Sequence, residues 1–208
     1  MVEWLISNQP VDYNYAVKFM EERIRLINDN LEDELVWLLE HPSMYTAGLS
    51  AKNDEVVEKL FPIYRTNRGG KYTYHGPGQR IVYLMLNLKK RNSCDIRLYV
   101  KNLSSWIINV LKYFDILGEY KEDRIGIWVN DSRVEKKIAA FGIRIRKWIT
   151  YHGIAINVAP NLSHYRGIIP CGLQNYGVTS MEELGSKTSF SQLDNILKQE
   201  FCKIFHLV

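Results

Sequence analysis

Cysteine is scarce in this chain: the 208 residues include three, Cys94, Cys171 and Cys202, an odd number with no close spacing. This argues against a disulfide framework and favours a reducing compartment. The first residues have no basic region followed by an apolar core, so we expect no secretory signal and a cytoplasmic protein. No apolar run approaches the roughly 20 residues that a membrane-spanning helix needs.

Nucleotide and metal motifs are also missing. The sequence has neither a Walker loop nor a Gly-x-Gly-x-x-Gly pattern, and no His and Cys share a metal-ligand spacing. The net charge is a mild +4, with Lys and Arg scattered except at residues 89–91 and 144–147. Nucleic-acid binding therefore has little support, whereas an acidic protein partner fits the same small excess.

What is present is typical of a globular protein. Hydrophobic residues make up 46% of the chain and charged residues 24%. No low-complexity linker or internal repeat divides the sequence, and its length suits one hydrophobic core. We therefore expect a single domain over residues 1–208.

Apolar periodicity predicts the secondary structure. Helical spacing indicates helices at residues 12–27 and 95–114, and a third helix behind the capping box at 189–192. A similar capping pattern at 180–183 predicts another helix start. Short apolar or alternating runs predict strands at 35–39, 81–88, 126–129, 143–146 and 154–158. This order favours an α+β fold, with a central mixed or largely antiparallel sheet flanked by helices.

The most informative segment is residues 68–79, which holds four glycines, a proline, Arg68 and His75. Glycine adopts backbone conformations closed to other residues and lets a ligand approach the main chain. A loop of this composition beside an apolar strand predicts either a binding site or an unusual turn.

Cys171 lies between Pro170 and Gly172, where a tight bend would present a small side chain to a ligand. The alternative is a buried cysteine that acts as a small apolar residue, as we expect for Cys94 and Cys202. Cysteine reacts as its thiolate, so a nearby cation would favour reaction. Lys137, just before an apolar Ile-Ala-Ala run, is one candidate; its alternative is a strand-edge lysine that faces water.

Histidine supplies the other titratable candidates. His75 lies inside the glycine-rich segment and His152 lies at a predicted strand junction. Each is either a functional group or a hydrogen-bonded structural histidine. His41, which precedes Pro42, we interpret as part of a turn.

Several of these segments together resemble the lipoate-protein ligase B family, the octanoyl-[acyl-carrier-protein]–protein N-octanoyltransferases. Six segments carry the resemblance in the family's order, over roughly residues 35 to 185: residues 41–48, 68–79, 137–142, 148–158, 170–172 and 177–180. The resemblance implies the fold of biotin and lipoate ligases without their ATP machinery, and no cofactor or metal.

The resemblance also implies a reaction. The residue at the position of Cys171 takes octanoyl from octanoyl-acyl-carrier protein as a thioester, and the lysine at the position of Lys137 lowers the pKa of that thiol. The acceptor is a lysine of lipoyl domains, in 2-oxoacid dehydrogenases and the glycine cleavage H protein. Nucleic acid and membrane are not implied as partners.

The residues that by resemblance line an acyl pocket are Arg68, Gly69, Gly70, Lys71, Tyr72, Thr73, Tyr74, His75, Ala140, Phe141, Gly142, Gly153, Ile154 and Ala155. The apolar members suit an eight-carbon chain, since each buried CH₂ contributes about 0.8 kcal/mol. Leu49 replaces a basic residue that is frequent in the family, and Phe141 replaces a smaller aliphatic one, which would reshape the pocket. The alternatives are an ATP-dependent lipoate or biotin ligase, and a non-enzymatic acyl-carrier-binding module.

Overall fold

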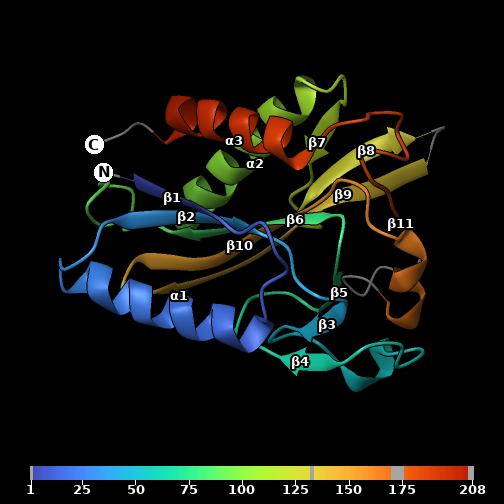
Figure 1. Cartoon of the computed structure of the whole chain (residues 1–208), viewed down its shortest axis with the longest axis horizontal. Helices are drawn as coiled ribbons and strands as arrows, with labels where there is room; N and C mark the ends of the chain where they lie inside the picture. Colours follow the sequence, from blue (N-terminus) through green and yellow to red (C-terminus); the bar gives the residue numbers. More distant parts are fainter. Residues whose placement is uncertain (1, 132–133, 170–175, 206–208) are drawn as a thin grey trace.

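The computed structural model describes residues 2–131, 134–169 and 176–205. A central sheet lies between helix α1 on one face and helices α2 and α3 on the other (Figure 1). The helices are α1 (Tyr13–Asn28), α2 (Ile96–Lys112) and α3 (Phe190–Ile204), with short 3₁₀ helices η1 (Asn53–Glu55) and η2 (Leu162–Gly167). None of the helices in the described part of the chain has the length and apolar character needed to cross a membrane.

The central sheet has the strand order β1-β2-β6-β10-β9-β8-β7, and β11 pairs with β9. Its strands are β1 (Val2–Ile6), β2 (Glu34–Leu39), β6 (Gln79–Met85), β7 (Gly118–Tyr120), β8 (Ile127–Asp131), β9 (Val134–Arg146), β10 (Ile149–Asn157) and β11 (Gly177–Val178). Among the described strands of this sheet, β1–β2 and β9–β11 are the parallel pairs and the others are antiparallel. The expected mixed, largely antiparallel sheet flanked by helices is therefore confirmed.

A second, smaller sheet lies at one end of the first and has the order β4-β3-β5, with β3 (Met44–Ala47), β4 (Ile63–Arg65) and β5 (Tyr72–His75). Strand β5 lies inside the glycine-rich segment, which we had interpreted as a continuous loop. That interpretation is wrong because residues 72–75 pair with β3 in antiparallel register. The segment is thus a short loop, a strand and a turn that leads into β6.

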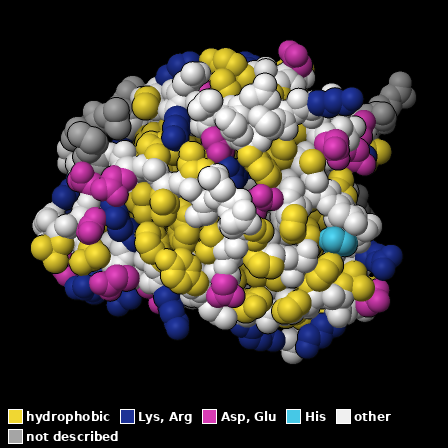
Figure 2. Space-filling view, viewed as in Figure 1, with side chains coloured by type: hydrophobic (Ala, Val, Ile, Leu, Met, Phe, Trp, Pro, Cys, Tyr) yellow, Lys and Arg dark blue, Asp and Glu magenta, His cyan; other side chains and the backbone are white. Residues whose placement is uncertain are grey.

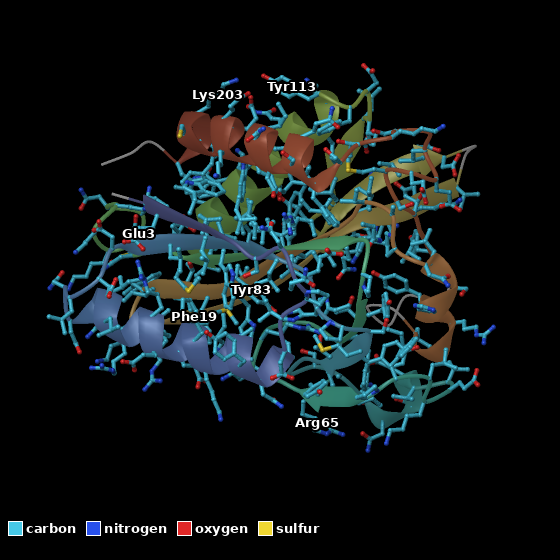
Figure 3. All side chains as sticks on the ribbon, viewed as in Figure 1. Glu3, Phe19, Arg65, Tyr83, Tyr113 and Lys203 are labelled. Carbon is cyan, nitrogen blue, oxygen red and sulfur yellow. The ribbon has the colours of Figure 1, made fainter. Side chains whose placement is uncertain are left out.

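The predicted helices form for the expected reasons. The Asp12 carboxylate accepts a hydrogen bond from Tyr15 N at 2.9 Å, and the Asp95 carboxylate accepts one from Leu98 N at 3.0 Å. Side chains at α-helical spacing then cover the sheet. Phe19 of α1 and Tyr83 of β6 lie in the layer between that helix and the sheet (Figure 3).

The capping pattern at residues 180–183 does not start a helix, so that prediction is wrong. Ser180 Oγ does accept a hydrogen bond from Glu183 N at 3.1 Å, but the Glu183 carboxylate accepts one from Thr179 Oγ1 instead of closing the box. Gly185, at φ +85°, then ends the segment as a turn. A local capping signal needs a helical continuation, and this one has none.

The central strands differ from the predicted alternating pattern. All nine residues of β10 are buried, because α1 covers one face of this strand and α2 and α3 lie over the other. Strand β9 runs over 13 residues, well beyond the predicted 143–146. Its inner half and β10 both contribute residues to the candidate site.

Candidate active site

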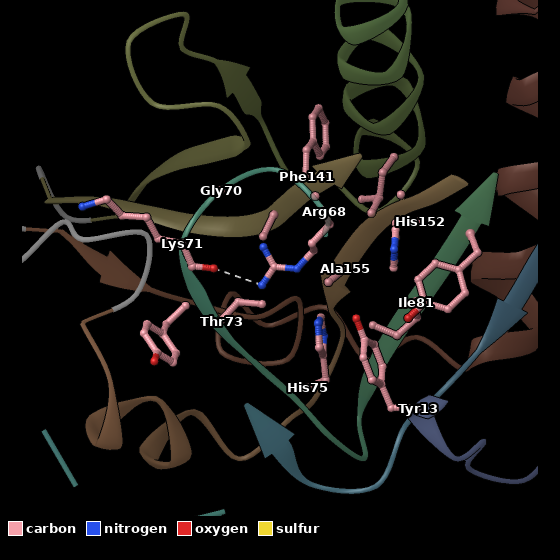
Figure 4. Close-up of a pocket in the computed structure, with 16 residues that line it drawn as sticks. Tyr13, Arg68, Gly70, Lys71, Thr73, His75, Ile81, Phe141, His152 and Ala155 are labelled. Carbon is pink, nitrogen blue, oxygen red and sulfur yellow. Dashed lines mark hydrogen bonds between the residues drawn. The ribbon is translucent and has the colours of Figure 1, made fainter. Parts of the chain in front are cut away.

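One cavity is lined by the glycine-rich segment, the inner half of β9, the middle of β10 and the start of α1 (Figure 4). We call it the loop cavity. Of the residues expected to line an acyl pocket, all except Gly69 and Tyr74 line it. The structure adds four residues: Tyr13, Ile81, Tyr83 and His152. Nothing in the local sequence singles out Tyr13 or Tyr83, because they reach the cavity only through the packing of α1 on β6.

Tyr74, in β5 of the smaller sheet, packs its side chain against η2 and does not line the loop cavity. Its hydroxyl forms hydrogen bonds with Ser43 Oγ at 3.0 Å and His164 Nδ1 at 2.9 Å. The ring packs against Tyr45 and Tyr165 in a separate apolar cluster. Tyr74 therefore supports the cavity wall from behind.

Arg68 holds the glycine-rich loop in shape. Its buried guanidinium donates hydrogen bonds to Gly69 O (2.8 Å), Lys71 O (3.0 Å) and both oxygens of Thr46 (2.7 and 2.9 Å). A Cβ at Gly142 would lie 2.7 Å from Arg68 Cδ, so this position on β9 needs a glycine. Arg68 lines the cavity, but most of its donor capacity serves the loop.

Two histidines line the loop cavity, and both are neutral at pH 7. Burial lowers the pKa of His75 to about 3, with smaller contributions from His41 and Arg68. Burial also lowers the pKa of His152 to about 3, helped by the charge of Arg68. His152 lies within β10 at φ +57°, a conformation rare for a non-glycine residue.

His41 is more than a turn residue, which corrects our interpretation. It is fully buried, and burial lowers its pKa to about 4. Its Nδ1 lies 2.6 Å from Val11 O and its Nε2 lies 2.7 Å from Tyr83 Oη. In the neutral ring Nδ1 therefore donates and Nε2 accepts. His41 packs against Tyr83 and His75, so it orders the cavity wall.

Lys137 lines a neighbouring cavity, which we call the lysine cavity. The side chain is buried, with the residue 6% exposed. Its Nζ donates a hydrogen bond to Ile125 O at 3.1 Å and lies 4.7 Å from the centre of the Trp128 ring. The alternative of a lysine facing water is thereby excluded. Gly70, Lys71 and Phe141 line both cavities, so the two are contiguous.

Cys171, with Pro170 and Gly172, lies outside the described residues. Both described flanks of this segment are anchored. Before it, Ile169 N donates a hydrogen bond to Glu55 O at 2.8 Å, and the Glu55 carboxylate binds Lys71. After it, β11 pairs with β9 so that Val178 lies opposite Lys137. The other two cysteines, Cys94 and Cys202, are exposed, so the expectation that they are buried apolar residues is wrong.

Comparison with known proteins decides the family. Residues 12–202 match the lipoyl protein ligase A/B catalytic domain. The chain belongs to this family. The octanoyltransferase of Wolbachia pipientis wMel is 75% identical over 205 residues, which cover 99% of this chain and 100% of that relative. The octanoyltransferase of Ehrlichia canis is 57% identical over 206 residues, covering 99% and 96%. This chain is accordingly an acyltransferase of the octanoyltransferase type, which confirms the family resemblance.

Solved structures agree on the fold. A bipartite lipoate protein ligase from Thermoplasma acidophilum superimposes with a TM-score of 0.73 at 15% identity, covering 100% of this chain and 85% of that one. A lipoate-protein ligase A bound with ATP gives a TM-score of 0.71 at 16% identity, covering 98% and 86%. At such low identity the likeness concerns the fold alone. The names of the much closer relatives favour octanoyl transfer over the ATP-dependent alternative.

Proposed function

We propose that this protein, acting as one catalytic domain, transfers octanoyl from octanoyl-acyl-carrier protein to a lysine of lipoyl domains, through a thioester on Cys171. The observation that carries the proposal is the pair of contiguous cavities. One is lined largely by apolar groups, and the other holds the buried ammonium of Lys137. An acyl chain in the loop cavity would place its reactive end beside Gly70 and Lys71, toward Lys137.

The loop cavity suits an aliphatic chain. Ile81, Ile154, Ala155 and Phe141 supply apolar surface. Each methylene buried here would contribute about 0.8 kcal/mol.

The described flanks support Cys171 as the nucleophile. The chain at Ile169 is tied to Glu55, whose carboxylate binds Lys71 at the border of the two cavities. Two residues of extended chain reach at most about 7 Å. We propose that Cys171, two positions beyond Ile169, reacts in this neighbourhood. In support, β11 returns the chain to the side of Lys137.

The chemistry proceeds in two balanced steps. The Cys171 thiol first loses its proton, and the thiolate attacks the thioester carbonyl carbon; the bond to the carrier sulfur breaks, and the departing carrier sulfur takes up one proton, balancing the one that Cys171 lost. The acceptor amine then attacks the new thioester, an amide bond forms, and the amine's proton passes to the departing Cys171 sulfur. The Lys137 ammonium stabilises the thiolate in both steps.

The oxyanion that forms in each step needs hydrogen-bond donors. The Gly69 N–H is already committed to Ile143 O at 3.1 Å. The amides of Gly70 and Lys71, which line both cavities, are better placed to donate to the oxyanion.

The proposed acceptors are the lipoyl domains of 2-oxoacid dehydrogenases and the glycine cleavage H protein. A thiolate nucleophile requires a reducing compartment, for which we propose the cytoplasm. Acidic and basic side chains are interspersed over the face shown in Figure 2. We propose that the carrier protein docks at a local cationic site, which is treated below.

Intact-mass spectrometry after incubation with octanoyl-acyl-carrier protein tests the proposal. We expect the wild type to gain the mass of one octanoyl group and Cys171→Ser to gain none under the same conditions. The matched controls Cys94→Ser and Cys202→Ser change exposed cysteines and should form the adduct normally. An adduct of wild-type yield in Cys171→Ser, or a requirement for ATP and magnesium, would refute this mechanism.

A further inference from the structure

The inner end of the loop cavity is polar, although most of its wall is apolar. Figure 4 shows His75, His152 and Tyr13 pointing into the same region, with Lys71 at the opposite side of the view. Lys71 borders the lysine cavity, where the reactive end of the acyl chain would lie. The two imidazoles therefore face the far end of a bound chain, where a plain octanoyl group offers only a methyl group.

The hydrogen bonds of His75 define which of its nitrogens can bind a ligand. The Gln79 side chain is oriented by its Nε2, which donates to Asn157 Oδ1 at 2.9 Å and Tyr165 Oη at 3.0 Å. Its Oε1 therefore accepts from His75 Nδ1, at 2.7 Å. Because His75 is neutral, its Nε2 is a hydrogen-bond acceptor.

His152 has a hydrogen-bonding capacity that the described protein does not use. The residue is 2% exposed, and its Nε2 is buried without a hydrogen-bond partner among the described residues. Burial of an unpaired polar atom costs free energy, and so does the left-handed backbone conformation at this position. Aromatic packing against Tyr151 and Tyr83 nevertheless holds the imidazole at the cavity wall.

We propose that His75 and His152 form a hydrogen-bonding subsite, and that the enzyme therefore also transfers medium-chain acyl groups with a hydroxyl at or near the far end of the chain. This inference rests on the proposed function. The hydroxyl would donate to His75 Nε2 and accept from the His152 ring. The transfer itself is unchanged: the acyl–sulfur bond breaks, the amide bond forms, the thiol is released with a proton, and the hydroxyl does not react.

A comparison of octanoyl and 8-hydroxyoctanoyl carrier protein as donors for the wild type tests the subsite without any variant. An apolar pocket rejects an added hydroxyl by about 100-fold in kcat/KM. A subsite that pairs the hydroxyl should keep the two donors within about 10-fold of each other. A wild-type preference for octanoyl of about 100-fold or more would overturn the inference.

His152→Phe keeps a ring of similar shape and removes both nitrogens. We expect the preference for octanoyl over 8-hydroxyoctanoyl, measured as the ratio of their kcat/KM values, to rise to about 100-fold. The matched control His164→Phe makes the same replacement outside the cavity and should leave the preference as in the wild type. An equal loss for both donors in a folded His152→Phe variant would count against the subsite.

Calorimetric titration with free octanoic and 8-hydroxyoctanoic acids separates binding from chemistry. Comparable binding of both acids, with transfer of neither acyl group, would refute the proposed function and leave the subsite standing. Octanoyl transfer combined with binding of octanoic acid alone would refute the subsite and leave the proposed function standing.

Discussion

Burial removes water from around the Lys137 ammonium group. Two contacts compensate for part of this lost hydration. The carbonyl of Ile125 accepts one hydrogen bond, and the face of Trp128 lies beneath the ammonium. Gly126, at φ +142°, leaves room for the lysine stem, since a Cβ there would lie 3.1 Å from Lys137 Cε. Its neighbour Lys136 binds Asp131 and is more exposed. Two adjacent lysines thus have different surroundings.

This difference between Lys136 and Lys137 gives a test of whether Lys137 activates the Cys171 thiol. Replacing Lys137 with Met removes a nearby cation and should raise the pKa of the Cys171 thiol. One pKa unit would slow alkylation by iodoacetamide about tenfold at neutral pH. The pH profile of alkylation should accordingly move to higher pH.

Lys136→Met is the matched control, because it removes the same charge one position away. Its alkylation profile should coincide with that of the wild type. An unshifted profile for Lys137→Met would remove this lysine from thiol activation.

The two ends of strand β9 have different surroundings. Its inner half carries Lys137, Ala140, Phe141 and Gly142 along the two cavities. Its outer end carries Arg144 and Arg146, both exposed, and Lys147 follows in the tight turn to β10. Residues two apart on a strand share a face, so the two arginines present their charges in the same direction.

We expect this outer end to bind the acidic carrier protein. The double variant Arg144→Glu/Arg146→Glu should raise KM for octanoyl-acyl-carrier protein about tenfold at low salt, with a small effect on kcat. Steady-state kinetics at several salt concentrations measures both constants.

Lys18→Glu/Lys112→Glu is a control that reverses two exposed charges on α1 and α2. Its KM should stay close to that of the wild type. An unchanged KM for the arginine variant would place docking elsewhere on the molecule.

At the scale of the whole molecule, the fold brings together three histidines that are distant in sequence and keeps them neutral. Burial is the main cause of the lowered pKa of His41, His75 and His152, to about 4, 3 and 3. In the unfolded chain each would titrate near its ordinary value of about 6.5. Below that pH the unfolded state therefore binds more protons than the folded state.

The free energy of unfolding should accordingly be greatest above about pH 6.5 and fall as the pH is lowered toward 4, by up to about 1.4 kcal/mol per pH unit for each histidine. Urea denaturation at a series of pH values measures this slope. NMR provides the specific check, since the ring signals of these three histidines should not titrate between pH 8 and 5. A midpoint near 6.5 for any of them would contradict the burial argument.

The sequence by itself determined the three helices, five of the eleven described strands and the family. Apolar side chains at helical spacing behind Asp12, Asp95 and Ser189 predict α1, α2 and α3 to within a residue or two, because capping and amphipathic burial are local properties. The motifs around His75, Lys137 and Gly153 likewise identify most of the cavity wall. The same local reasoning predicted a false helix at residue 180 and overlooked the short strands β1, β3, β4, β5, β7 and β11.

Only the tertiary structure decided which surroundings each candidate has. Tyr13 and Tyr83 reach the loop cavity because α1 packs on β6, and Lys137 is buried because β8 and β11 pair with β9 on either side of it. Burial, hydrogen-bond partners and the neutrality of the histidines depend on atoms from segments far apart in the chain. A pattern in neighbouring residues carries no information about such atoms. Burial, hydrogen-bond partners and histidine neutrality are therefore set only when these distant segments pack together.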